Sequence, residues 1–172
     1  MTQFKRKLIG RGSFTKAYQI SENQVEVVTT CPSKECYAIF SQGNPFAPVV
    51  EKLDYLHSGE SVYLMPLYAK VKAPSRELNP ESLEVYKALR AINNKYSVRN
   101  YNDFCSEVDG TSLSEDVKEY VKDLCGDVCN GIDCYDLGFE ISPRNIAVGK
   151  DGQLIMLDCF FSRKLLIKTS KR

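Results

Sequence analysis

The stretch Glu140-Ile141-Ser142-Pro143-Arg144-Asn145 decides the fold, because a short hairpin and a second acid follow it. The hairpin consists of two apolar runs, 146–148 and 154–157, joined by the turn Gly149-Lys150-Asp151-Gly152. Short apolar runs on either side of a glycine-containing turn are typical of paired strands. The hairpin therefore carries an asparagine before its first strand and an acid, Asp158, after its second.

A second informative stretch lies near the other end, Gly10-Arg11-Gly12-Ser13-Phe14-Thr15-Lys16-Ala17-Tyr18. Two glycines allow a strand-turn-strand backbone to pass close over phosphates, with amide groups facing the anion. The simpler alternative is an ordinary hairpin turn. A dinucleotide-binding turn is a poorer interpretation, since a strand rather than a helix follows the glycines.

The remaining sequence predicts strands first, then helices, then the hairpin, which indicates an α+β chain. The expected early elements are strands at 8–9, 14–20 and 25–30, a helix at 33–41, and a hairpin of 49–56 with 61–67 around the turn 57–60. After a linker at 69–80 we expect a helix from Pro80 to about Asn93 and a polar, irregular stretch at 94–110. Ser112-Leu113-Ser114-Glu115 predicts a capping box that opens a second helix, which ends near Gly131.

Composition narrows the classes of protein and partner. The 172 residues are 43% hydrophobic and 26% charged, enough for a folded core, and the net charge of +1 argues against a mainly electrostatic nucleic-acid binder, so no nucleic-acid partner is expected. Seven cysteines, without a signal peptide or an apolar run of membrane-spanning length, predict reduced thiols in a cytoplasmic protein with no membrane association. Cys125, Cys129 and Cys134 match no common zinc spacing, so no structural metal is expected.

Taken together, the two stretches resemble the eukaryotic-type protein-kinase fold. The glycine-rich GxGxFxxAY pattern stands at 10–18, and an acid-x4-Asn hairpin with a following aspartate stands at 140–158. The order of elements is also similar to the early serine/threonine kinases of short-tailed coliphages. The resemblance implies a reduced two-lobed kinase-like fold, with an antiparallel N-terminal sheet at 1–68, a hinge at 69–80 and a small, mostly helical C-terminal lobe at 81–172.

The resemblance also implies a role for each matching position. Glu140 would take the place of the catalytic base, and Asn145 and Asp158 would hold Mg²⁺. The remaining candidates would bind ATP, over its phosphates or around its adenine: Gly10, Gly12, Ser13, Ala17, Met65 and Leu67. The residues after Pro66 would form the hinge.

Three departures from the family pattern argue against efficient catalysis. The third strand, Val25-Glu26-Val27-Val28-Thr29-Thr30, lacks the lysine that pairs with the α- and β-phosphates. Glu140 stands where kinases have aspartate; its extra methylene displaces the carboxylate by about 1.5 Å, which can cost roughly a hundredfold in rate. Asp158-Cys159-Phe160 replaces Asp-Phe-Gly, and the residues up to Arg172 leave no room for a full activation segment.

A cation from elsewhere could replace the missing lysine. With-no-lysine kinases supply it from the second strand, where Lys16 lies one residue out of register; Arg11 and Lys34 are further candidates. Two functions follow: a weak or inactive pseudokinase that binds a host protein and ATP, which we favour, or an active atypical serine/threonine kinase acting on host proteins. A hydrolase that uses Glu140 and Asp158 as its acid and base is a weaker alternative, since it gives the asparagine no role.

Overall fold

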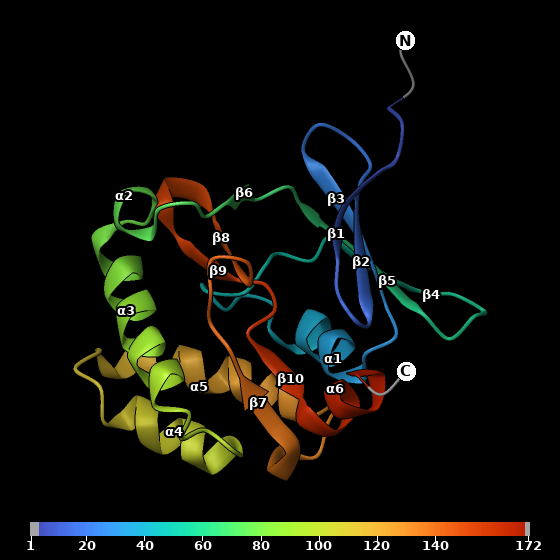
Figure 1. Ribbon diagram of the computed structural model, residues 1–172. Coiled ribbons are helices and arrows are strands. Elements are labelled where there is room, and N and C mark those ends of the chain that lie inside the picture. Colours follow the sequence, from blue (N-terminus) through green and yellow to red (C-terminus); the bar gives the residue numbers. More distant parts are fainter. Residues whose placement is uncertain (1–3, 171–172) are drawn as a thin grey trace.

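The computed structural model describes residues 4–170, without the side chains of Lys52 and 168–170; residues 1–3 and 171–172 of the predicted lobes lie outside it. Figure 1 shows a twisted sheet on one side of the molecule and most of the helices on the other. The sheet is antiparallel with the order β1-β2-β3-β5-β4. Its strands are β1 (Lys7–Arg11), β2 (Thr15–Gln19), β3 (Gln24–Thr29), β4 (Lys52–Tyr55) and β5 (Ser61–Pro66).

Alternation along β3 explains how this sheet folds. Val25, Val27 and Thr29 are buried, whereas the residues between them are partly exposed. Period-two burial of β-branched residues is typical of a strand with one covered face. The cover comes from α1 (Pro32–Phe40), whose Ala38 packs with Val25, Val27 and Tyr63 in a small core. Pro32 begins the helix and ends the strand region.

The helical side is built on a larger core. It contains α3 (Pro80–Lys95), α4 (Tyr101–Asp109) and α5 (Glu115–Cys129), with the short α2 (Pro74–Glu77) before them and α6 (Arg163–Ser170) near the end. Phe104 of α4 is fully buried, and its ring centroid lies 4.9 Å from that of Phe139 in a tilted contact and 5.2 Å from that of Phe160 in an edge-to-face contact. These aromatic contacts join the helices to the strands that carry the candidate site.

Five short strands connect the two sides. The hairpin strands β8 (Ile146–Val148) and β9 (Leu154–Met156) pair with each other, and β6 (Ala69–Lys70) adds to β8. A second pair consists of β7 (Leu137–Phe139) and β10 (Phe160–Ser162). The predicted α+β class with an antiparallel N-terminal sheet is therefore confirmed. Since α1 packs against α5 and the α1 residue Tyr37 belongs to the larger core, the lobe boundaries at 68 and 80 stay predictions.

Two local predictions were wrong, and a third stretch contains short elements that were not predicted. The stretch 94–110 is not irregular: Asn100 caps α4 by accepting a hydrogen bond from the Asp103 amide, and the polar residues of this helix face solvent. Ser112 does not cap α5, which starts after Ser114 without a side-chain cap bond. The stretch 69–80 contains β6 and α2, because pairing with β8 and a proline at the helix start outweigh its polar composition. Its role as a linker between lobes stays a prediction.

Candidate functional site

Backbone hydrogen bonds bring Glu140, Asn145 and Asp158 together at the open end of the β8–β9 hairpin. The Asn145 carbonyl accepts hydrogen bonds from the amides of Leu157 (2.9 Å) and Asp158 (3.1 Å). The Glu140 amide donates to the Cys159 carbonyl at 2.9 Å. We call Glu140, Asn145 and Asp158 with these backbone bonds the frame. Ile141, Ile146 and Met156 next to it are buried, so the frame is attached to the larger core. The three positions predicted from spacing thus share one place.

The side chain of Asn145 is oriented by its own neighbour. Its Nδ2 donates to the Glu140 carbonyl at 3.2 Å, which leaves the amide oxygen for another partner. Together with the half-exposed Asp158 carboxylate, this oxygen gives the hard donors that Mg²⁺ prefers. No group of three His, Cys, Asp or Glu that could hold a metal occurs within residues 4–170. Two protein ligands fit Mg²⁺ all the same, since it usually completes its shell with water and phosphate oxygens.

Lys34 brings a positive charge to this frame. It lies in the first turn of α1, and its Nζ forms an ion pair with Asp158 Oδ1. Its side chain is 15% exposed, against 45% for Asp158. Burial alone would lower the pKa of Lys34, but the Asp158 carboxylate, with a smaller contribution from Tyr63, leaves that pKa raised. Lys34 is therefore charged at neutral pH.

Strand β3 has a threonine, not a cation, at its inward-facing end. Thr29 is buried, and its hydroxyl lies 3.0 Å from that of Thr15 and accepts from the Cys31 amide at 3.1 Å. As the sequence already showed, β3 has no lysine. The nearest lysine along the chain is Lys34, in the first turn of α1, the element that follows β3. Lys34 was only one of three candidates from the sequence; its burial beside Asp158 distinguishes it.

The other two candidate cations, Lys16 and Arg11, are both exposed. Lys16 is exposed and precedes Ala17, which packs on the small core of the sheet. Successive strand residues point to opposite faces, so Lys16 lies on the outer face. Arg11, at the end of β1, pairs across the strands with Lys16 and is exposed as well.

The glycine turn connects β1 to β2 and is anchored at both ends. The Gly12 amide donates to the Thr15 carbonyl at 2.8 Å, and the Phe14 carbonyl accepts from the Thr30 amide at 3.1 Å. Gly10 and Gly12 do not have positive φ, and a Cβ on Gly12 would come no nearer than 3.9 Å to Thr15 O. The free fold does not require glycine at these positions, and the exposed Ser13 amide region is open to a ligand.

The residues predicted to surround adenine, Ala17, Met65 and Leu67, differ in their surroundings. Ala17 and Met65 both pack on the small core of the sheet. Leu67 lines a different cavity, of about 630 Å³, with the loop 43–49 and the β8–β9 hairpin, and neither Ala17 nor Met65 borders it. Leu67 follows the last residue of β5, so strand alternation does not fix its direction as it does for Met65.

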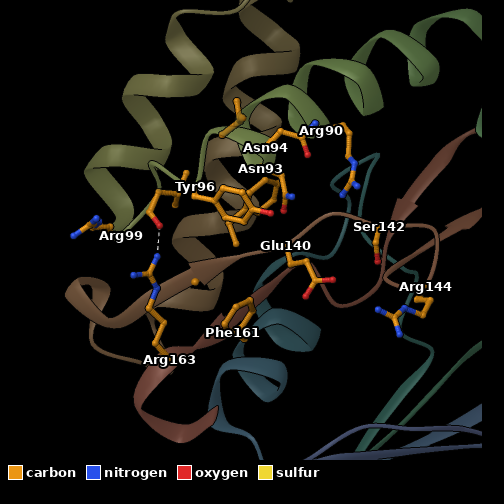
Figure 2. A pocket seen from close by; sticks show the side chains of 14 residues that line it. Arg90, Asn93, Asn94, Tyr96, Arg99, Glu140, Ser142, Arg144, Phe161 and Arg163 are labelled. Atoms are coloured by element: carbon orange, nitrogen blue, oxygen red, sulfur yellow. Dashed lines mark hydrogen bonds between the residues drawn. The ribbon is translucent and has the colours of Figure 1, made fainter. Parts of the chain in front are cut away.

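Glu140 lines a second cavity, of about 660 Å³. Figure 2 shows Glu140 among side chains from the end of α3, from the loop before β8 and from the β10–α6 junction. Glu140 is exposed, so its carboxylate can reach a ligand there. Sequence spacing located Glu140 but gave no sign of this cavity, because its walls come from segments far apart in the chain.

The cysteines are spread over the fold, and three of the seven are buried: Cys31, Cys125 and Cys159. All seven are free thiols; Cys125 is buried, Cys129 lies one turn further along α5, and Cys134 is exposed. Burial raises the pKa of the Cys125 thiol, with a further contribution from its hydrogen bond with Cys129. Within the described part of the chain, no helix is long and apolar enough to cross a membrane.

No protein-family model and no curated protein matches this sequence. Similar solved structures include two GDP complexes of aminoglycoside 2'-phosphotransferase-IIIa, one of a mutant (12% identity, TM-score 0.43, 92% of this chain and 66% of that one) and one of the wild type (12%, 0.40, 90% and 65%). A third is a thermostable mutant of aminoglycoside phosphotransferase APH(4)-Ia in its apo form (12%, 0.38, 94% and 69%). These proteins are phosphotransferases, and the chain spans about two thirds of their length.

Proposed function

We propose that this chain is a diverged protein-kinase-like domain that binds ATP with Mg²⁺ and transfers phosphate weakly or not at all. In this proposal it acts mainly by engaging a protein partner, a host protein in the cytoplasm if the chain is encoded by a phage. The observation that carries the proposal is the ion pair of Lys34 with Asp158, whose amide is bound to the Asn145 carbonyl. Lys34 thus lies at the Asp158 carboxylate, and the backbone holds Asn145 next to Asp158.

This arrangement supports nucleotide binding through an exchange of partners. Lys34 can move from the carboxylate to a phosphate, since both are anions and the half-exposed Asp158 is open to water. Asp158 and Asn145 would then hold Mg²⁺, whose charge would stabilise the phosphates. The glycine turn would cover them with backbone amides.

Weak transfer follows from the same geometry. Lys34 is fixed on a helix beside Asp158, so its reach toward the phosphates differs from that of a lysine on a strand. Glu140 extends about 1.5 Å further than an aspartate would, which misplaces the base relative to an acceptor hydroxyl.

An active serine/threonine kinase is the second candidate. It is favoured by the exposed Glu140 carboxylate on the wall of a cavity of about 660 Å³, a volume in the range of ligand sites. A substrate hydroxyl held in that cavity could donate its proton to Glu140.

Thermal unfolding with and without ATP–Mg²⁺ tests the nucleotide site. At a ligand concentration of about 100 times Kd, binding adds about 2.7 kcal/mol, or roughly 5–10 °C in Tm. We expect Lys34→Met to lose most of this shift. Lys16→Met is the matched control, since it removes a lysine beside the glycine turn but on the outer face of the sheet, and it should keep the shift. A full shift in Lys34→Met would contradict the proposal.

Incubation with labelled ATP and Mg²⁺, with and without cell lysate, separates the two functions. Label transfer that disappears in Asp158→Ala and in Asn145→Ala would establish the kinase and overturn the pseudokinase. A nucleotide-dependent Tm shift without transfer would support the binding module.

A further inference from the structure

The cavity beside Glu140 is strongly basic. Its lining includes four arginines and a single carboxylate: Arg90, Arg99, Arg144, Arg163 and Glu140. None of the four arginines has a salt-bridge partner among the described residues. The charge is local, because the whole chain has a net charge of only +1. Figure 2 shows Arg99 and Arg163 toward one end of the cavity and Arg90 and Arg144 toward the other.

Two of these arginines are held by hydrogen bonds to backbone carbonyls, and the other two are exposed. Arg90 Nη1 donates to the Ile141 carbonyl at 2.7 Å, and Arg163 Nη2 donates to the Val98 carbonyl. Arg99 and Arg144 are exposed. A guanidinium has five donors, so even the two fixed ones keep N–H groups for a ligand. The cavity thus combines a rigid positive wall with two adaptable side chains.

The remaining lining suits a polypeptide. Asn94 brings a side-chain amide, Asn93 keeps only its NH2 group because its Oδ1 accepts from the Ile141 amide at 3.1 Å, and the aromatic rings come from Tyr96 and Phe161. Tyr96 is 85% exposed, in the left-handed conformation that ends α3, with φ of 53°. The buried Ser142 hydroxyl has no hydrogen-bond partner among the described residues. Amides can pair with a peptide backbone, whereas an aromatic surface beside arginines accommodates side chains of mixed character.

We propose that this cavity binds an acidic segment of a protein partner, with aspartate or glutamate side chains on the arginines. The inference rests on the proposed function, because the segment would bring an acceptor or pseudo-acceptor hydroxyl to Glu140. Charge-assisted hydrogen bonds from guanidinium to carboxylate are directional and can be bidentate. A basic segment would be repelled by the same four side chains.

Fluorescence anisotropy of two labelled peptides tests this directly, without nucleotide. One peptide has a central serine flanked by aspartates; the other has asparagines in their place, which keeps the shape and removes the charge. We expect the aspartate peptide to bind more tightly, with a preference that declines at high salt. Equal binding of the two peptides, or no binding of the aspartate peptide by folded protein, would overturn the inference.

Peptide affinities of arginine variants test whether the cavity is the peptide-binding site. Arg99→Gln with Arg144→Gln removes the two exposed charges, leaves both backbone-bound arginines in place, and should weaken the aspartate peptide about tenfold. Arg76→Gln is the charge-matched control on α2, outside the cavity, and should bind as the unchanged protein does. The single variant Arg144→Glu should abolish the preference for aspartate. Unchanged affinity in the double variant would place the peptide elsewhere and refute the assignment.

The Tm shift with ATP–Mg²⁺, measured on the same preparations without peptide, separates the two proposals. A normal nucleotide shift without peptide binding refutes this inference alone. Peptide binding without a nucleotide shift refutes the nucleotide site and leaves an acidic-segment binding module.

Discussion

The proposed nucleotide site has two parts that are built differently: Glu140, Asn145 and Asp158, which we call the hairpin wall, and the glycine turn 10–13, which we call the sheet wall. On the hairpin side, backbone hydrogen bonds fix Glu140, Asn145 and Asp158 above the larger core. On the sheet side, the exposed glycine turn stands over a small core of Val25, Val27, Ala38 and Tyr63. The hairpin wall is therefore preorganised without a ligand, whereas the sheet wall is stabilised by little packing.

Lys34 lies between the two walls and belongs to both. Its helix covers the sheet through Ala38 and packs against α5 on the helical side, while its side chain reaches Asp158. A nucleotide that draws Lys34 away from Asp158 would therefore act on the contact that joins the walls. This difference implies that ligand binding orders the sheet side more than the hairpin side.

The largest expected effect comes from the core under the hairpin wall. Phe104→Ala should lower the free energy of unfolding by about 3–5 kcal/mol, since it leaves a void between Phe139 and Phe160. Val27→Ala, its counterpart under the sheet, should cost only about 1.5 kcal/mol for two methyl groups. Urea unfolding measures both. A cost for Phe104→Ala as small as that for Val27→Ala would show that the larger core gives the hairpin wall little support.

The next largest effect concerns the position of the Glu140 carboxylate on the hairpin wall. Glu140→Asp shortens the side chain by one methylene and should raise any phosphate transfer, by up to about a hundredfold, if the extra length is what misplaces the base. Its backbone stays fixed by the bond to the Cys159 carbonyl, so stability should hardly change. Initial rates with labelled ATP provide the measurement.

Glu140→Gln is the control for this prediction, since it keeps the length and removes the base. It should lower the transfer rate further. If Glu140→Asp also lowers transfer, the glutamate is adapted to this site, and the interpretation of Glu140 as a relaxed position is wrong.

The sequence predicted the hairpin wall better than the sheet wall. The acid-x4-Asn spacing and the apolar runs around Gly149 and Gly152 are local, and local turn chemistry brings Asn145 and Asp158 together. The cation was harder to find, because Lys34 meets Asp158 only through the packing of α1 against α5. The order of elements alone does not give that contact.

The basic cavity could not be read from the sequence either. Arg90, Arg99, Arg144 and Arg163 are spread over more than seventy positions and converge only in the folded chain. The prediction of an irregular stretch in place of α4 failed for another reason. Phe104 and Val108 of this helix are fully buried, but solvent-facing residues dominate its composition. Where a fold depends on one or two buried side chains per helix, average polarity is a poor guide.

The smallest expected effect concerns the exposed wall. Gly12→Ala should leave the fold intact, or stabilise it by about 0.4–1 kcal/mol, because φ is not positive there and the new methyl group has room. Gly59→Ala is the matched control in the β4–β5 turn: its φ of 78° should make alanine cost about 1–2 kcal/mol. If phosphates approach the glycine turn closely, Gly12→Ala should reduce the Tm shift with ATP–Mg²⁺, whereas Gly59→Ala should keep it. An unchanged nucleotide shift in Gly12→Ala would mean that the turn does not touch the ligand, and that the sheet wall serves only to position Lys34.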